Sequence, residues 1–325
     1  MAFFLYQTLS FHTSLLKKKL TTMIKNLFLS LLVGLFFISC NKTVQNAEEM
    51  HVNEGHITVV ADESFKNIVD AEVNAYMSHY PKTEFDIVYV PEQKAIGLML
   101  SDSAELAIVS RPLTEKEQNY YLARNIEYQP GRMALDAVTL ITSKDVNLES
   151  ISMAQLSSIL KGEESEYKLV FDNSSSSNLN LMLDKFEIKE LSNTNISAAK
   201  GTEDVFNFIE NSKKSIGVIG HNWISDEDHK PSMALKSRVK ILGIQVEDGS
   251  VIYPNAQSLR SQSYPLIKTV YLHTTQHRWG VAKGFVRFAC SQIGQLVVEK
   301  MGLQPYYLIP KKYEMFDTPE ISTVE

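Results

Sequence analysis

The feature that most constrains the fold is a regular alternation of β-rich runs with segments of helical period. His56–Ala61 is followed by apolar residues spaced three and four positions apart as far as Tyr80, and this order recurs toward the carboxyl end. Alternating strands and helices are typical of α/β folds with largely parallel sheets. The expected strands are His56–Ala61, Phe85–Val90, Leu106–Val109, Leu135–Ile141, Leu169–Phe171, Ser215–Gly220, Val239–Ile244 and Lys268–His273.

Several of the helices between these strands are marked by capping residues. Thr114 with Glu117, and Ser152 with Gln155, have the spacing of a capping box. Gly162 is a typical residue just beyond a helix C-terminus. The apolar spacing predicts further helices over Phe65–Tyr80, Glu92–Leu100, Leu179–Phe186, Thr202–Glu210, Lys283–Cys290 and Ser291–Lys300.

Residues 1–39 have the pattern of a signal peptide. Leu27–Ile38 is an unbroken run of apolar and small residues, shorter than the ~20 residues that a spanning helix needs. Cys40 follows after one small residue, and this arrangement resembles a bacterial lipobox. The resemblance implies lipidation of Cys40, and hence an extracytoplasmic protein anchored in the cell envelope, on the periplasmic side or at the cell surface.

The surroundings of this signal leave two points open. Residues 1–22 precede a complete signal, which indicates either a mis-assigned start in place of Met23 or a longer basic region containing Lys17–Lys19. An uncleaved membrane anchor is the alternative to lipidation. Residues 40–54 are polar beyond the cysteine and are typical of a flexible tether.

The charge of residues 40–325, the body of the chain, argues against nucleic acid as a partner. Without the four lysines of residues 1–39, the 32 basic residues fall to 28 against 38 acidic ones, a formal charge of −10. A surface for nucleic acid or for an anionic membrane would be expected to have the opposite sign. An anionic ligand would therefore have to be held by local hydrogen-bond donors.

Such donors are predicted at Leu169–Asn178, where a short apolar strand runs into four consecutive serines and then into a helix. The first turn of a helix has unpartnered N–H groups, and its dipole favours negative charge. Serine hydroxyls add further donors. The segment therefore predicts an anion site, with a solvated serine linker as the alternative reading.

Two more turns of this kind lie in the first half of the body. Ser64 follows the first strand, and Ser110-Arg111 follow the buried strand Leu106–Val109. Open α/β sheets bind ligands at the carboxyl ends of their strands, and arginine can hold an oxyanion through two N–H bonds. Candidate turns in both halves of the chain predict two lobes with a cleft between them, although Arg111 could also be a surface loop residue.

Seven short motifs follow one another along the body: ADESF at 61–65, LAIVSRPLTEKE at 106–117, ALDAVTLIT at 134–142, QLSSILKG at 155–162, VFDN-x-x-S at 170–176, SIGVIGHNW at 215–223 and GFVRFACSQIGQ at 284–295. Together they resemble the phosphate-binding component of Pst-type ABC importers in its lipoprotein form. The resemblance extends from about Ile57 to Pro310. It implies a monomeric solute-binding protein without cofactor or enzymatic activity, with inorganic phosphate and ABC permease subunits as partners.

The resemblance also implies a two-lobed type II periplasmic-binding-protein fold, with mixed sheets flanked by helices and two crossover strands as hinges. Residues 55–142 and 240–325 would form the first lobe, and residues 143–239 the second. The ligand residues that it implies are Ser64, Phe65, Ser110, Arg111, Ser176, Ser177 and Asn178.

This chain departs from the family pattern at two places. Ser176-Ser177-Asn178 stands where members have Ser-Gly-Thr, and Asn180 replaces a basic residue. Members also use an aspartate, commonly just after the strand ending here at Val109, to accept the proton of hydrogen phosphate; Arg111 stands in that region. Asp62 and Asp136 remain candidates for this role. The departures leave open another anion, or a surface interaction protein with a degenerate site.

An enzyme is the rival class. Asp226–His229 form an acidic cluster, and His273 and His277 are spaced four residues apart, but no hydrolase, metalloprotease or nucleotide-binding motif is present. A solvated loop is the simpler interpretation of the cluster, and no metal site is expected. Cys290 lies on an apolar helix face, which favours burial over a role as a nucleophile.

Overall fold

The computed structural model describes residues 51–163, 165–189, 191 and 194–308, which belong to one unit, Met50–Glu325. Cys40 and the signal segment lie outside the described residues, so lipidation stays a prediction. Within the described ranges, no helix combines the length and the apolar character that crossing a bilayer requires.

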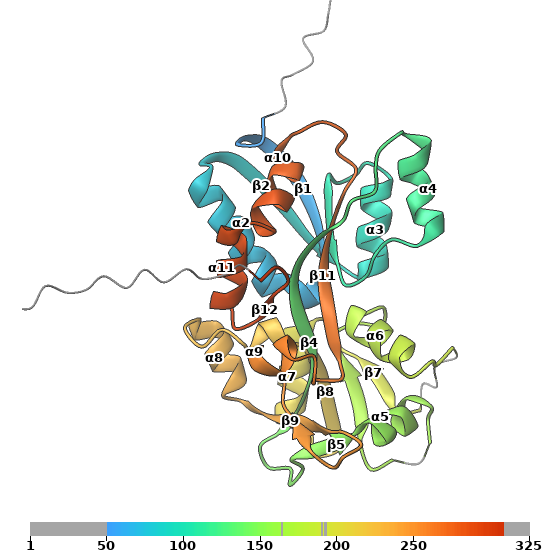
Figure 1. The fold of residues 1–325 in the computed structure, drawn as a ribbon. Helices are drawn as coiled ribbons and strands as arrows, with labels where there is room; N and C mark the ends of the chain where they lie inside the picture. The colour runs from blue at the N-terminus through green and yellow to red at the C-terminus, as the bar shows by residue number, and fades with distance from the viewer. Residues whose placement is uncertain (1–50, 164, 190, 192–193, 309–325) are drawn as a thin grey trace, which may run out of the picture. The chain divides into compact units, whose positions relative to one another are not determined.

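A long strand, β4 (Gly131–Ser143), joins the two halves of the sheet (Figure 1). Its first half pairs with β11 and β12 and its second half with β8 and β9, all antiparallel. The main strand order is β2-β1-β3-β11-β4-β8-β6-β7, with parallel pairs around β1 and β6, so the sheet is mixed. The other strands are β1 (Glu54–Asp62), β2 (Lys82–Val90), β3 (Leu106–Val109), β5 (Ser150–Ser152), β6 (Lys168–Phe171), β7 (Ile196–Ala198), β8 (Ser215–Gly220), β9 (Val239–Gln245), β10 (Val251–Ile252), β11 (Ile267–Thr274) and β12 (Gln304–Pro305).

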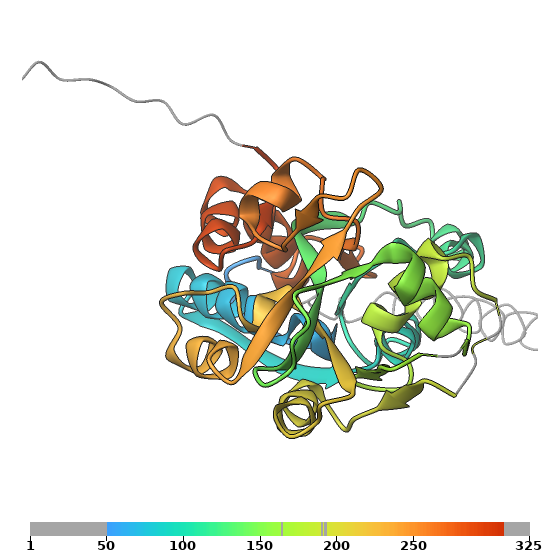
Figure 2. The same ribbon diagram turned by 90° about the horizontal axis from the view of Figure 1, so that it is seen from below.

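Helices cover both faces of each half of the sheet. In the first half, α2, α10 and α11 enclose one apolar core and α3 and α4 enclose another. In the second half, α5, α6 and α9 lie on one face and α7 on the other, as Figure 2 shows from below. The helices are α2 (Lys66–His79), α3 (Glu92–Leu100), α4 (Glu115–Ala123), α5 (Met153–Leu160), α6 (Ser177–Lys185), α7 (Thr202–Glu210), α8 (Lys230–Lys236), α9 (Ala256–Arg260), α10 (Val281–Ala289) and α11 (Gln292–Lys300), with the 3-10 turns η1 (Glu63–Phe65) and η2 (His221–Trp223).

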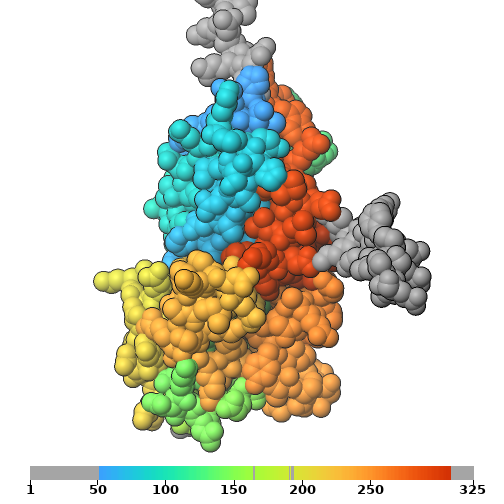
Figure 3. All heavy atoms as spheres, turned by 90° about the vertical axis from the view of Figure 1, so that its left-hand side faces the viewer, coloured from blue at the N-terminus to red at the C-terminus, as the bar shows by residue number. Residues whose placement is uncertain are grey.

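Segments far apart in the sequence meet in the first of these cores. Ile68, Val69 and Tyr76 of α2 pack against Phe285 and Phe288 of α10. Figure 3 shows α2 (blue to cyan) and the C-terminal helices (red) side by side on one face. The first half of the fold is therefore completed only by the end of the chain.

The apolar cores define two lobes whose limits differ from those expected. The core of the second lobe begins with Ala137 and Val138 of β4 and extends through Leu242 and Ile244 of β9 as far as Leu266. The return crossing thus lies next to the start of β11, not near residue 240. The physical reason is pairing: β9 hydrogen-bonds to the second half of β4 and to β5, which holds it in the second lobe.

Candidate functional site

Two serines, one from each lobe, meet at the centre of the molecule. Ser64 lies in η1, directly after β1, and Ser177 is the first residue of α6, after β6. Their Oγ atoms are 2.9 Å apart, and both side chains are completely buried. Asp62 Oδ1 accepts hydrogen bonds from Ser64 N at 2.9 Å and from Ser177 Oγ at 3.0 Å. The first and second lobes are thus joined through hydroxyl groups at two helix starts.

The serine turn adopts the predicted helix start. Ser176 is the N-cap of α6, and its Oγ accepts a hydrogen bond from Asn178 N at 3.1 Å. Asn173 Oδ1 accepts one from Ser175 N at 2.9 Å, which tightens the turn before the cap. These local bonds are what Asn and Ser side chains provide at turns and caps. They direct Ser177 and Asn178 inward.

A buried lysine, Lys268 of β11, lies beside these serines. Its Nζ donates to Ser64 Oγ at 2.8 Å and to Asn178 Oδ1 at 2.6 Å, and it lies 4.3 Å from the centre of the Phe65 ring. Lys268 is the register partner of Asp136 on β4, and Nζ lies 3.9 Å from Asp136 Oδ2. Burial raises the pKa of Asp136, and the nearby ammonium group of Lys268 partly offsets this.

The hydrogen bonds of this group run in one direction. A carboxylate can only accept, so the single proton of Ser177 Oγ is donated to Asp62. Ser64 must then donate its proton to Ser177, and Ser64 Oγ accepts from Lys268 Nζ. An ammonium group is therefore connected to a carboxylate through two hydroxyl groups.

Asn222 closes the other side of the group. Its Nδ2 donates to Ser64 O at 2.6 Å and to Asp136 Oδ2 at 2.8 Å, and its backbone N donates to Asp136 Oδ1 at 3.1 Å. Gly220, at the end of β8, allows this approach, because a Cβ there would lie 2.5 Å from Ser64 O and 2.8 Å from Asn222 Nδ2. The contact between the lobes thus depends on a missing side chain.

Asp172, at the end of β6, is buried, and neither of its carboxyl oxygens has a hydrogen-bond partner among the described residues. Burial, with a contribution from the charge of Asp62, raises the pKa of Asp172 to about 7, although the nearby Ser176 hydroxyl group and the charge of Lys268 act in the opposite direction. The Nδ2 of Asn178 is likewise buried and without an acceptor in the described part of the chain. This region therefore holds both an acceptor and a donor whose capacity the protein does not use.

Ser110 and Arg111 belong to a second cluster. The guanidinium group of Arg111 donates to Glu117 Oε1 and Oε2, both at 2.9 Å, and also to Gln93 Oε1 and Pro112 O. Hydrogen bonding to Arg111 holds the pKa of Glu117 down at about 2. Ser110 Oγ donates to Glu92 Oε1 at 2.6 Å. No hydrogen bond between described residues connects Arg111 with Ser64 or Ser177.

A crevice of about 370 Å³ opens between the lobes beside this second cluster. Ser110 and Arg111 line it from the first lobe and Asn180 and Lys185 from the second. Neither Ser64 nor Ser177 contributes to its wall. The predicted ligand residues therefore fall into a buried group, around Ser64 and Ser177, and a crevice group, around Arg111.

The acceptors proposed from sequence are fully engaged. Asp62 accepts hydrogen bonds at both oxygens, with Glu92 N bound to Oδ2 at 3.1 Å, and Asp136 also accepts at both. Among the described carboxyl groups beside Ser64 and Ser177, Asp172 is the one that accepts no hydrogen bond. Sequence reasoning missed Asp172 and Lys268; the position of Asp172, directly between a buried strand and the serine turn, was the available signal.

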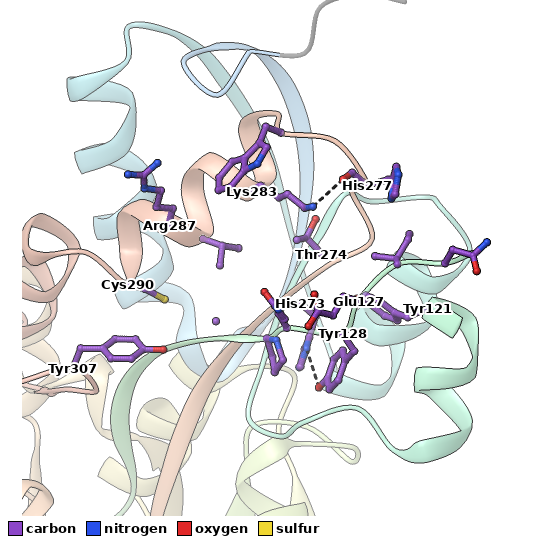
Figure 4. Close-up of a pocket in the computed structure, with 17 residues that line it drawn as sticks. Tyr121, Glu127, Tyr128, His273, Thr274, His277, Lys283, Arg287, Cys290 and Tyr307 are labelled. Carbon is purple, nitrogen blue, oxygen red and sulfur yellow. Dashed lines mark hydrogen bonds between the residues drawn. The ribbon is translucent and has the colours of Figure 1, made fainter. Parts of the chain in front are cut away.

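A larger cavity, about 550 Å³, lies within the first lobe (Figure 4). Tyr128, His273, Cys290 and Tyr307 are among its lining residues, and none of the predicted ligand residues is. Tyr128 stacks on His273, whose ring also hydrogen-bonds to Arg111 O at 3.0 Å. Burial raises the pKa of Cys290 to about 11, which disfavours a reactive thiolate.

The acidic cluster forms a hydrogen-bonded turn. Asp226 Oδ1 accepts from Asp228 N and His229 N, and Lys300 approaches the carboxylates of Asp226 and Asp228 at 3.6 and 2.6 Å. Within the described ranges, no group of three or more His, Cys, Asp or Glu side chains is arranged to hold a metal ion.

Comparison with known proteins connects this geometry to a family. Residues 46–292 match the family model described as a PBP superfamily domain. The chain is similar to the phosphate-binding protein PstS of Staphylococcus aureus (strain USA300), with 22% identity over 214 residues, 62% of this chain and 63% of that protein. The corresponding protein of Staphylococcus epidermidis is 22% identical over 227 residues, 66% of each chain. The match thus spans less than two thirds of these relatives.

Solved structures show the same fold. A substrate-binding protein from Clostridium perfringens, solved with bound phosphate, has a TM-score of 0.65 at 17% identity and aligns over 78% of this chain and 100% of its own. An ABC-type phosphate transport receptor from Vibrio cholerae has a TM-score of 0.59 at 17% identity, over 77% and 100%. The two-lobed α/β fold predicted from the sequence is confirmed.

Proposed function

Because the chain belongs to the PBP superfamily, we propose that it is an extracytoplasmic solute-binding lipoprotein that captures inorganic phosphate, or a similar oxyanion, between its two lobes for an ABC importer. The relatives named as phosphate-binding proteins support phosphate as the first candidate. Lipidation of Cys40 and a monomeric state are part of this proposal. The protein is a binding protein and not an enzyme.

The observation that carries the proposal is the meeting of Ser64 and Ser177. Their hydroxyl groups come from different lobes and lie 2.9 Å apart at the starts of two helical segments. An anion bound here would replace the hydrogen bonds from Ser64 to Ser177 and from Ser177 to Asp62 and would then receive donors from both lobes, so it would favour the closed state over an open one. Asn178 Nδ2 offers additional N–H donors at the same place.

Asp172 supplies a reason for preferring phosphate to sulfate. Its oxygens are buried and unpartnered in the described residues, so a ligand oxygen that carries a proton could donate to them. Above the raised pKa of Asp172, where the carboxylate can only accept, a fully ionised anion would instead face an unpaired acceptor, which is unfavourable in a buried site. In this proposal Asp172, and not Asp62 or Asp136, accepts the proton of hydrogen phosphate.

A second function follows from the cluster around Arg111. Four N–H bonds of its guanidinium group are used within the protein, and Asn180 replaces a basic residue beside it. These two features favour a surface interaction protein of the same fold with a degenerate ligand site, or a different anion, as the alternative.

Isothermal titration calorimetry on the purified protein tests the proposal. We expect phosphate to bind and sulfate to bind more weakly. Ser177→Ala should weaken phosphate binding by about 10- to 100-fold, since a hydrogen bond to a charged group is lost. The exposed serine Ser103, replaced by alanine, provides the control and should leave the affinity unchanged. An absence of heat with phosphate, or equal affinity for sulfate, would refute phosphate as the ligand.

A further inference from the structure

Lys268 is unusual among the cations of this protein because it is buried in the plane where the lobes meet. Among the described residues it is the one lysine or arginine that is buried, with 2% of its surface exposed. Burying an ammonium group is costly unless it is paired and hydrogen-bonded. Packing alone therefore does not explain why a lysine is buried at this position of β11.

The contacts of Lys268 connect it to both lobes. Nζ donates to Ser64 Oγ of the first lobe and to Asn178 Oδ1 of the second, which are two of the residues expected to bind the ligand. An ammonium group has three N–H donors, and the described residues accept two hydrogen bonds from it. The third donor is available to an additional acceptor close to Ser64.

The surroundings of Lys268 are acidic. Asp136 Oδ2 lies 3.9 Å from Nζ, Asp62 is joined to Nζ through Ser64 and Ser177, and the charge of Lys268 acts on Asp172. An anion placed among three carboxyl groups would be repelled, because charges a few ångströms apart interact strongly when they are shielded from water. A neutralising cation within the group is therefore a requirement for anion binding here.

Arg111 does not meet this requirement. Its guanidinium group is bound to Glu117 through two hydrogen bonds, and Nε faces Glu92 Oε2 at 3.7 Å. It also lines the crevice and not the buried group around Ser64. The positive charge of Arg111 is thus already matched by two carboxylates.

From these contacts we infer that Lys268 is the cation of the ligand site, and that its ammonium group binds the anion directly and sets the affinity of the site. This inference rests on the proposed function, because it assumes an anion between Ser64 and Ser177. The carboxylate of Asp136, on the neighbouring strand, then offsets part of the positive charge of Lys268 and so weakens anion binding. The two side chains are expected to change affinity in opposite directions.

Phosphate titrations of two variants test this role. We expect Lys268→Met to bind phosphate at least about 100-fold more weakly than the wild type, the usual effect of removing one partner of a buried charged contact. Asp136→Asn keeps the shape and the hydrogen bonds accepted at Oδ1, although its NH2 group cannot accept the one from Asn222 Nδ2, and we expect it to bind about tenfold more tightly. Lys300→Met, which removes a lysine whose side chain is 58% exposed, is the matched control and should bind like the wild type.

The outcomes separate the inference from the proposed function. If the wild type binds phosphate and Lys268→Met binds it equally well or better, Lys268 is only a counter-ion for Asp136 and the inference is wrong. Weaker binding by Asp136→Asn would also overturn it, and this variant decides the matter if Lys268→Met does not fold. If the wild type binds no anion, the proposed function fails, and the role of Lys268 fails with it.

Discussion

Replacing Glu72 with glutamine is expected to stabilise the protein, and to do so increasingly as the pH rises. Glu72 lies on the face of α2 that carries Ile68, Val69 and Tyr76, is completely buried, and has no hydrogen-bond partner for either carboxyl oxygen among the described residues. Burial raises the pKa of Glu72 to about 9. The folded protein thus keeps this carboxyl group protonated at neutral pH, whereas the unfolded chain does not.

The sign of the effect follows from proton release. Above the ordinary pKa of glutamate, unfolding releases the proton of Glu72, so each further pH unit lowers the free energy of unfolding by about 1.4 kcal/mol until the folded group ionises near pH 9. Stability from this group is complete below about pH 4 and is lost toward pH 9. Between about pH 5 and pH 8 the loss amounts to up to about 4 kcal/mol.

Glutamine has nearly the same shape and no proton to release, so the variant should escape this loss. Urea unfolding, followed by far-UV circular dichroism at pH 5, 6, 7 and 8, measures the free energy of unfolding of both proteins. We expect wild type and Glu72→Gln to differ little near pH 5 and the variant to be more stable by several kcal/mol near pH 8. Glu115→Gln, at an exposed position of α4, is the control and should show no such trend. A difference that is constant with pH would refute a buried, protonated Glu72.

Two further predictions concern the contact between the lobes. Asp172→Asn should raise the free energy of unfolding near pH 8 but not near pH 4. Burial raises the pKa of Asp172 to about 7, so the wild type loses stability above the ordinary pKa of aspartate because unfolding releases this proton. Urea unfolding at both pH values measures the difference, and an equal gain at pH 4 and pH 8 would contradict the prediction. Gly220→Ala should weaken phosphate binding by an order of magnitude or more while preserving the circular dichroism spectrum, because its Cβ would lie 2.5 Å from Ser64 O and hold the lobes apart. Unchanged affinity in calorimetry would show that the lobes need not approach as closely as this.

The sequence predicts the longer elements well because their signals are local. The bounds of β3, β8, α3 and α7 agree with those expected, and the capping boxes of α4 and α5 are both present. The strands β5, β10 and β12 have only two or three residues and exist through pairing with distant segments, so no local pattern indicates them. The same reason explains the return crossing at Leu266, since β9 belongs to the second lobe through its pairing with β4.

The residues of the candidate site differ in the same way, because some have local sequence signals and others do not. Ser64, Ser177 and Asn178 could be found because turns and helix starts have recognisable residues, and the structure brings these three together. The partners of Arg111 were not foreseen. Glu117 was recognised as half of a capping box, and its carboxylate both accepts from Thr114 N and binds the guanidinium group of Arg111. A residue that serves a local motif can therefore also neutralise a candidate ligand residue.

Lys268 could not be found in this way, because what places it at the site is strand register. On β11 it faces Asp136 of β4, and these strands are the two along which the chain passes between the lobes. Antiparallel pairing puts both side chains on the same side of the sheet, directly where the first core gives way to the second at Ala137. A shift of one residue in either strand would turn one member of the pair to the opposite face. The position of the Lys268 charge beside Ser64 is thus fixed by the register of the two strands on which the chain passes between the lobes, and we expect an anion bound at Ser64 to interact directly with these strands.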